Sequence, residues 1–551
     1  MRKASAGVAP GTWAMLAVLA AGAALRLTAI AYGLPHVYNA DEPHVVNMAV
    51  ALSGGPRPYS FKYPTLWPEL LAAAYGLWFL LWSGFGLLRG AVDFAAKYAF
   101  APTGFYLIGR LLSTASQIGA LALVARLERG GDSKRWAYGA ALLAFSPTLV
   151  ELAHSAKPDS FMLLLVAAAT AAALRHQSGG RRGWLLASAF CAGLACSTQY
   201  TAVPAGLIVP LAWLLCDSGP GPFSWLIQAA LVSALGFALG TPFALIDHAR
   251  FAADWNDYGD LARLEPHDAV DTAKIILKNL WCFGGVGSLG GAAALLGLCV
   301  GLKRGVKRAL LLLLPVAGYA AALSVSFNGG VPRYLLGAYP MLALLAGEGF
   351  SALGGSQTWR RGLVLALAVA PGLYLTFRDD AALLLPDTRA QSTAWLAASV
   401  PAGSTLLLDQ SHAGPFAIMT KEQCAELAER AAKNASPRAR LYRAMADKHP
   451  GGGYRIYRIQ RAARDLWSAP RQVALSQADG DFLDVRPGLD VARAARVDYV
   501  ITSSFGADPR RSRELATFFT ELASQADFVQ EFPSEPGVSV GPWLRVYRLR
   551  R

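Results

Sequence analysis

Long apolar stretches separated by short polar loops fill the first two thirds of the chain. A helix needs about 20 consecutive apolar residues to cross the hydrocarbon core of a bilayer. The pattern therefore predicts a polytopic helical membrane protein. The apolar segments are 12–33, 64–87, 103–127, 136–153, 158–175, 183–199, 202–216, 222–247, 281–302, 308–326, 333–352 and 361–377.

The loops 128–135, 175–183, 303–308 and 359–361 are short and basic, which favours the cytoplasmic side of a membrane. If every apolar segment crosses, these loops cannot all share one side. They do share the inner side if segment 64–87 lies on the outer surface or is re-entrant. We therefore expect eleven spans plus this non-crossing helix, and the alternative is twelve spans with a weak charge bias.

This orientation places the remaining polar segments on the outer face. They are the first loop after segment 12–33, the turn 153–159, the loop 248–280, residues 328–333 and everything after residue 377. The positive-inside rule also accounts for much of the net charge of +14, so we do not expect a nucleic-acid partner. Of the 551 residues, 54% are hydrophobic and only 16% are charged, below the roughly 25% typical of soluble domains.

The pattern changes near residue 378, where charged residues become denser. We divide the chain into a transmembrane domain, 1–377, and a C-terminal extracytoplasmic domain, 378–551. Residues 385–409 predict a helix, a turn and a buried strand, and 495–504 predict another strand. The run "FTELASQADFVQEF" predicts a helix entering a strand, and the alternating 543–550 predicts an edge strand. A small α/β domain follows.

The first outer loop contains an adjacent acid pair, Asp41 and Glu42. A carboxylate at the membrane surface can act as general base for an acceptor, or the pair can bind a divalent cation. The alternative is an acidic helix start with Pro43 in the first turn. The pair alone favours the helix start.

Other candidates lie at the outer ends of the spans. An arginine there can snorkel to the interface or hold a phosphate by its bidentate fork. The turn 153–159 can be a solvated turn in which Asp159 caps the next helix. Together the groups suit a substrate that is both lipidic and phosphorylated. They are His44, Lys62, Tyr63, Arg110, His154, Lys157, Asp159, Arg333 and Tyr334.

Several short motifs follow one another in a characteristic order: "ADE", "KYPTLWPELLAAAYGL", "GRLLS", "SPTLVELAHSAKPDS" and "PRYLLGAYP". Over about residues 12–352 the chain resembles the GT-C glycosyltransferases, in the branch with protein O-mannosyltransferases and bacterial lipid A aminoarabinose transferases. Two departures are Thr65, where a second proline is usual, and Ala40, where proline is common.

The resemblance implies a GT-C fold of about 11–12 transmembrane helices. It implies sugar transfer from a polyprenyl-phosphate donor to a lipid, glycan or protein acceptor, at the outer face of a bacterial-type plasma membrane. By position, Asp41 matches the first-loop catalytic aspartate and Glu42 its acidic neighbour. Lys62, Arg110 and Arg333, with Tyr334, would hold the donor phosphate. The substrate-binding candidates are His44, Tyr63, His154, Lys157 and Asp159.

We expect a direct inverting displacement, because nothing points to a second carboxylate placed as nucleophile. The competing class is a membrane transporter or flippase of a lipid-linked saccharide. Such proteins usually show internal repeats and polar residues at the membrane midplane, and this chain has neither pattern.

Overall fold

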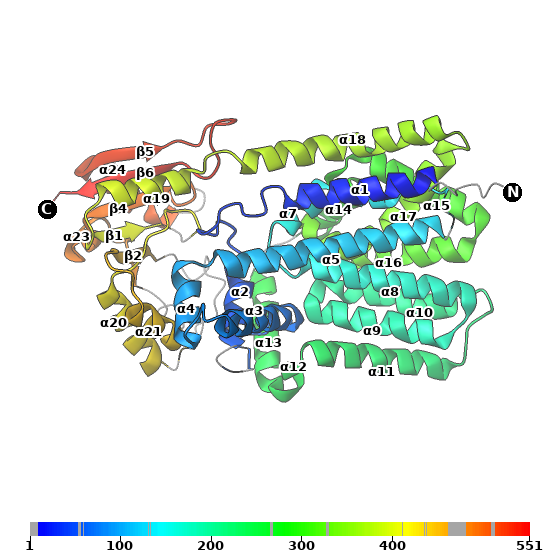
Figure 1. The fold of residues 1–551 in the computed structure, drawn as a ribbon, viewed down its shortest axis with the longest axis horizontal. Coiled ribbons are helices and arrows are strands. Elements are labelled where there is room, and N and C mark those ends of the chain that lie inside the picture. Colours follow the sequence, from blue (N-terminus) through cyan, green and yellow to red (C-terminus); the bar gives the residue numbers. More distant parts are fainter. Residues whose placement is uncertain are drawn as a thin grey trace. The chain divides into compact units, whose positions relative to one another are not determined.

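The computed structural model divides the chain into two compact units (Figure 1). Unit 1 contains residues 1–30, 60–71 and 107–380, and unit 2 contains residues 31–59, 72–106 and 381–551. Most of the first outer loop, up to residue 59, thus belongs with the C-terminal residues in unit 2, while residues 60–63 belong to unit 1. The structure describes residues 9–52, 55, 57–58, 60–130, 132, 134–264, 268–326, 330–409, 412–434, 436, 438–460, 481–508 and 513–550.

Unit 1 is built from helices, whose long members run side by side (Figure 1). They are α1 Pro10–Leu27, α5 Thr103–Arg129, α6 Tyr138–Ala144, α7 Pro147–Ala153, α8 Asp159–Gly179, α9 Arg182–Thr198, η1 Tyr200–Leu207, α10 Ile208–Leu214, α11 Phe223–Gly240, α12 Phe243–Ile246, α13 His248–Leu264, α14 Ala269–Trp281, η2 Phe283–Gly285, α15 Ser288–Arg304, α16 Val306–Ser324, η3 Pro332–Ala338, α17 Tyr339–Gly354 and α18 Thr358–Leu383. Helix α3, Leu66–Gly84, contributes residues to both units.

Among the described residues, seven helices are long and apolar enough to cross a membrane. They are Pro10–Leu27, Thr103–Arg129, Asp159–Gly179, Phe223–Gly240, Val306–Ser324, Pro332–Gly354 and Thr358–Leu383. The predicted multi-pass helical membrane protein is confirmed. The count of eleven crossings and the outer position of segment 64–87 stay predictions.

The structure differs from the predicted segments in several details, of which two matter for the site. The predicted segment 136–153 is two helices, α6 and α7, because Ser146 and Pro147 start a new helix. The Ser146 hydroxyl accepts a hydrogen bond from the Leu149 N–H (3.2 Å) and donates one to the Gly284 carbonyl (2.5 Å). The predicted loop 248–280 contains α13 and α14, and the Asp268 side chain caps the start of α14.

Close approach of helices in unit 1 depends on glycine. A Cβ atom on Gly297 of α15 would lie 1.8 Å from the Leu345 carbonyl oxygen of α17. On α9, a Cβ atom on Gly193 would lie 2.0 Å from the Ser233 carbonyl oxygen of α11. Small residues of this kind let neighbouring membrane helices pack backbone against backbone, where the hydrophobic effect gives little help.

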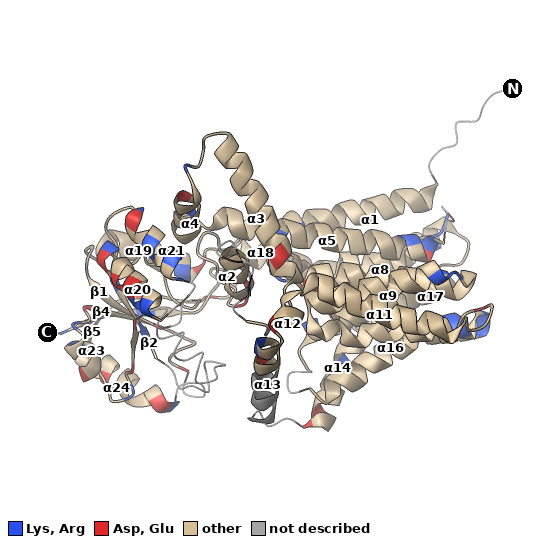
Figure 2. Cartoon of the chain, turned by 90° about the horizontal axis from the view of Figure 1, so that it is seen from below, with Lys and Arg blue, Asp and Glu red and all other residues tan. Residues whose placement is uncertain are grey.

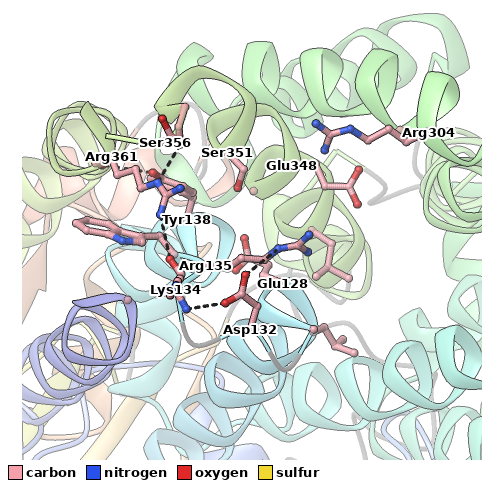
Figure 3. A pocket seen from close by; sticks show the side chains of 18 of the residues that line it. Glu128, Asp132, Lys134, Arg135, Tyr138, Arg304, Glu348, Ser351, Ser356 and Arg361 are labelled. Atoms are coloured by element: carbon pink, nitrogen blue, oxygen red, sulfur yellow. Dashed lines mark hydrogen bonds and ion pairs between the residues drawn. The ribbon is translucent and has the colours of Figure 1, made fainter. Parts of the chain in front are cut away.

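The basic loops gather at one end of the unit 1 helices (Figure 2). Residues of 128–135, 301–308 and 355–361 line one cavity of about 1070 Å³ there (Figure 3). Arg175 and Arg308 line the neighbouring cavity. The four loops predicted to share one side of the membrane therefore lie at the same end of unit 1.

The charged groups of this cavity are used largely to join its loops. Glu128 accepts hydrogen bonds from the backbone N–H groups of Gly139 (2.7 Å) and Ala140 (2.9 Å), so it caps α6. Arg308 pairs with Glu348 (3.1 Å). The Arg361 guanidinium donates to the Lys134 and Gly355 carbonyls (3.1 and 2.9 Å; Figure 3). These contacts point to a structural role for the cavity wall.

Within the described residues of unit 2, six strands form a sheet of order β3-β2-β1-β4-β6-β5. The strands are β1 Thr405–Leu408, β2 Arg455–Ile459, β3 Phe482–Leu483, β4 Tyr499–Ser503, β5 Ala526–Phe532 and β6 Leu544–Leu549. The first four run parallel, and β6 is antiparallel to β4 and β5. The helices of unit 2, besides its share of α3, are α2 Glu42–Leu52, α4 Ala91–Phe100, α19 Thr388–Ser399, α20 Lys421–Lys433, α21 Ala439–Asp447, α23 Asp490–Ala494, η5 Arg513–Leu515 and α24 Ala516–Gln525.

Both faces of this sheet are covered. Leu407 and Val500 pack with Phe518 of α24, while Leu406 and Leu396 belong to the cluster on the other face. This burial on both sides explains the apolar runs in β1 and β4.

The small α/β fold predicted for the tail is confirmed, including the helix, turn and strand of 385–409, the strand at 495–504 and the helix running into β5. The edge position predicted for 543–550 is wrong, because β6 pairs with β4 on one side and β5 on the other. Alternation along a strand reports which face is buried but not how many strands flank it.

Candidate functional site

The acid pair starts helix α2 in unit 2. Asp41 directly precedes the helix, and its backbone N–H donates to the Asn39 side-chain oxygen (3.0 Å). Glu42 is the first helical residue and its side chain is fully buried. The predicted acidic helix start is confirmed. The positive N-terminal end of the helix dipole favours a carboxylate at this position. A position at the helix start also leaves the Asp41 carboxylate able to act as a base.

Tyrosines surround the buried face of α2. The Glu42 carboxylate is close enough to Tyr75 and Tyr106 to interact with both hydroxyls electrostatically. The Tyr98 hydroxyl donates a hydrogen bond to the Asn47 side-chain oxygen, one turn and a half further along α2. His44 is half-buried on the same helix. The first loop therefore leads into a helix that is held on a polar aromatic surface.

The turn 153–159 lies in unit 1 and is buried. The Trp67 indole donates to the Ala156 carbonyl (3.0 Å), and the Ser113 hydroxyl bonds to the Ser155 carbonyl (2.8 Å). His154, Lys157 and Asp159 are each less than a tenth exposed. The solvated-turn interpretation is therefore wrong. Asp159 does not cap α8 either, because Pro158 is the capping residue and no side-chain bond is made there.

Arg110 lies beside this turn. Its side chain is only 2% exposed, and it donates a hydrogen bond to the Ile30 carbonyl (2.8 Å). Its positive charge acts on the His154 imidazole. Burial first, and then this charge and that of Arg26, lower the pKa of His154 to about 4. Snorkelling does not describe Arg110, which is a buried cation facing a neutral histidine.

Arg26 and Gln117 form a buried network that we did not predict as part of the site. Arg26 donates to the Gln117 side-chain oxygen (2.7 Å) and to the carbonyls of Ala144 (2.8 Å) and Leu143 (3.1 Å). Gln117 in turn donates to the Leu149 carbonyl (2.7 Å) and the Ser160 hydroxyl (2.9 Å). The network thus holds the chain on both sides of the turn. A charge inside the first apolar run was the signal available in the sequence.

Some buried polar atoms near the turn have no hydrogen-bond partner within the described part of the chain. They include Ser155 Oγ, Asp159 Oδ1 and Asp380 Oδ2. A buried polar atom left unpaired costs about 1–3 kcal/mol, so native proteins usually satisfy it with protein, water or a ligand. These atoms, together with Arg110, make the turn a candidate place to bind a polar group.

The remaining unit 1 candidates lie on two other segments. Lys62 follows Phe61, whose N–H donates to the Asp254 carboxylate (2.6 Å) and whose carbonyl accepts from the Tyr200 hydroxyl (3.0 Å). Tyr63 is half-buried on the same segment.

In η3, the Arg333 guanidinium lies 5.4 Å from the centre of the Tyr334 ring. Asp41, Glu42 and His44 belong to unit 2.

No group of three or more His, Cys, Asp or Glu side chains in the described ranges is arranged to hold a metal ion. A divalent cation at Asp41 and Glu42 stays a prediction.

Two comparisons found proteins that are similar to this chain. Residues 102–245, which run from the start of α5 through the buried turn to α12, match the family model "Dolichyl-phosphate-mannose-protein mannosyltransferase". The whole chain is similar to the crystal structure of ArnT from Cupriavidus metallidurans in the apo state. The TM-score is 0.56 at 14% identity, covering 96% of this chain and 97% of that chain. This likeness shows that the chain shares the fold of ArnT.

A second ArnT structure, bound to undecaprenyl phosphate, matches this chain equally well, with a TM-score of 0.56, 14% identity and coverage of 98% of both chains. At this identity the likeness establishes the fold. No curated protein matches the chain. The matched segment contains Arg110, His154, Lys157 and Asp159, so the part of the chain that matches the family model also contains the buried polar turn.

Proposed function

We propose that this protein transfers a sugar from a polyprenyl-phosphate-linked donor to a lipid, glycan or protein acceptor at the extracytoplasmic face of a bacterial-type plasma membrane. The observation that carries the proposal is the buried turn with Arg110, where cations and unpaired polar atoms lie within a helical membrane unit. Ionisable groups in such a place are costly and usually functional. The names of the matching family and of the ArnT complex, which cite dolichyl phosphate mannose and undecaprenyl phosphate, support the donor class.

The reaction breaks the bond between the anomeric carbon and the phosphate oxygen, and it forms a bond from that carbon to the acceptor oxygen or nitrogen. The leaving group is a phosphate, which needs stabilisation of its developing charge rather than a proton. Arg110 is suited to this task, because a guanidinium removed from water acts strongly on a nearby anion and can bind two of its oxygens. Lys62 and Arg333 are the further candidate cations.

The acceptor must lose a proton, and we assign this role to Asp41. Glu42 is its partner in orienting the acceptor or holding a cation. One carboxylate suffices for a direct displacement with inversion at the anomeric carbon, whereas retention needs a second carboxylate as nucleophile. The position of Asp41 at the start of α2 leaves its side chain partly exposed, as a base that meets an incoming substrate requires.

The test is sugar transfer from a panel of radiolabelled polyprenyl-phosphate hexoses and pentoses by the purified protein. Asp41→Asn should lower transfer about 10²–10⁴-fold, the usual contribution of a general base. Asp490→Asn is the matched control, because that carboxylate is 93% exposed on α23. Full activity of Asp41→Asn would refute the assigned base. A wild-type protein that moves these lipids across vesicles without transferring the sugar would favour the flippase alternative.

A further inference from the structure

The start of the first outer loop, residues 32–38, packs on the C-terminal residues of unit 2. The Tyr32 hydroxyl donates to the Asp387 carboxylate (3.0 Å). The Arg389 guanidinium stacks 3.6 Å from the centre of the Tyr38 ring. The His36 ring lies 4.9 Å from the Phe416 ring. Three side chains of one short segment thus bind a single region of the domain.

The surface on which this segment packs is formed by Asp387 and Arg389, which are fixed by contacts within the C-terminal domain. Arg389 binds the Asp387 carboxylate with two nitrogens (2.9 and 2.7 Å), and both side chains are less than a tenth exposed. The same carboxylate caps α19 by accepting from the Arg389 N–H (2.8 Å). Arg389 also donates to the His412 carbonyl (2.9 Å). Contacts within the C-terminal domain thus hold the ion pair in one geometry, without any contribution from the first outer loop.

The backbone around the ion pair is also fixed by hydrogen bonds. The Thr388 N–H donates to the Val540 carbonyl (2.9 Å), and the Val540 N–H donates to the Pro386 carbonyl (3.0 Å). The Thr388 hydroxyl donates to the Pro542 carbonyl (2.6 Å). Residues 386–388 are thereby fixed to the segment that precedes β6 and its sheet.

Tyr38 precedes Asp41 by only three residues, and the chain between them is tightened by the bond from the Asp41 N–H to the Asn39 side chain. On the other side of Asp41, helix α2 begins at once. Whatever fixes Tyr38 therefore restricts where the Asp41 carboxylate can lie.

We infer that Arg389, Asp387 and Tyr38 form a clamp by which the C-terminal domain positions the Asp41 loop for catalysis. The inference rests on the proposed function for its catalytic consequence, though not for the docking itself. Arg389 acts here as a positioning residue, since it acts on the reaction through Asp41. A guanidinium is required because one group must bind a carboxylate with two nitrogens, bind a carbonyl and stack on a ring.

The first measurement is independent of activity: amide hydrogen exchange of residues 32–52 in the purified full-length protein. Arg389→Met should speed exchange in this segment, and Arg389→Lys should do so nearly as much, because an ammonium cannot reproduce the fork. Tyr38→Leu should also speed exchange, whereas Tyr38→Phe keeps the ring face and should retain most of the protection. Arg455→Met is the control, because its ion pair with Glu426 lies on the same domain and is exposed.

The second measurement is steady-state transfer. Arg389→Met should lower kcat by about 10–10² fold, since misplacement of a catalytic group by about 1 Å can cost that much. The donor KM should change less than about twofold, because the donor cations lie on other segments. Rapid exchange at β1 and β4 as well would show that Arg389→Met has lost the domain fold. In that case the comparison of Tyr38→Leu with Tyr38→Phe tests the inference.

Three results separate the inference from the proposed function. Unchanged exchange of residues 32–52 in Arg389→Met and Tyr38→Leu overturns the clamp, whatever the activity. Faster exchange with unchanged kcat overturns the positioning role while leaving the docking in place. Full transfer by Asp41→Asn overturns the proposed base alone, because the exchange measurement does not depend on it.

Discussion

The Nδ1 atom of His154 lies 3.8 Å from the Oδ1 atom of Asp380, and both side chains are buried. His154 ends α7 and Asp380 is near the end of α18, so the contact joins the polar turn to the last long helix of unit 1. The residues are far apart in the chain, and Asp380 lies beyond the last predicted apolar segment. Helix α18 continues past that segment to Leu383, which brings Asp380 to the turn.

Acid should weaken unit 1 through His154. The pKa of His154 is about 4 in the folded protein and near 6.5 when the side chain is exposed. Between these pH values the imidazole is protonated in the unfolded chain but not in the folded one, which favours unfolding. The free energy of unfolding is therefore unaffected by His154 above about pH 6.5 and decreases as the pH falls towards 4. The full loss is about 3 kcal/mol. Thermal unfolding in detergent from pH 7 to 4.5 should show a smaller decline for His154→Gln than for wild type. Parallel curves would contradict the assignment.

Arg110→Lys should raise the donor KM about tenfold, because an ammonium keeps the charge but loses the two-pronged contact with phosphate. The inhibition constant of free polyprenyl phosphate should rise in the same proportion, since that molecule presents the same group. Arg378→Lys is the matched control, because that arginine is exposed and pairs with its neighbour Asp379. An unchanged KM in Arg110→Lys would remove Arg110 from the phosphate site.

Arg26→Met and Gln117→Leu should each lower the free energy of unfolding by about 1–3 kcal/mol, because each leaves buried polar groups without partners. The two side chains share a hydrogen bond of 2.7 Å. The double variant should therefore lose clearly less than the sum of the single losses. Apparent melting temperatures of the four proteins give the comparison, and strict additivity would show that the network is not coupled.

The orientation in the membrane can be read by cysteine labelling in a variant without native cysteines. Ser534→Cys lies in the C-terminal domain and should react with an impermeant maleimide in intact cells. Gly305→Cys lies in the basic loop between α15 and α16 and should react only after permeabilisation. Protection of residue 534 in intact cells would place the tail inside and refute the predicted orientation.

The sequence by itself determined the membrane class, most helix positions, the four basic loops that lie at one end of unit 1, and the main strands of the C-terminal sheet. These features follow from the length, period and charge of local segments, which are properties of consecutive residues. The motif order also gave the resemblance to the GT-C glycosyltransferases.

Only the tertiary structure decided which polar residues are buried and what they touch. Arg110 has the same sequence environment whether it snorkels or binds the Ile30 carbonyl, and β6 alternates in the same way at an edge or in the interior of a sheet. Asp380 reaches His154, and Arg389 reaches Tyr38, across hundreds of residues. Such contacts depend on how distant segments pack, and a local pattern contains no information about the partner on the other side.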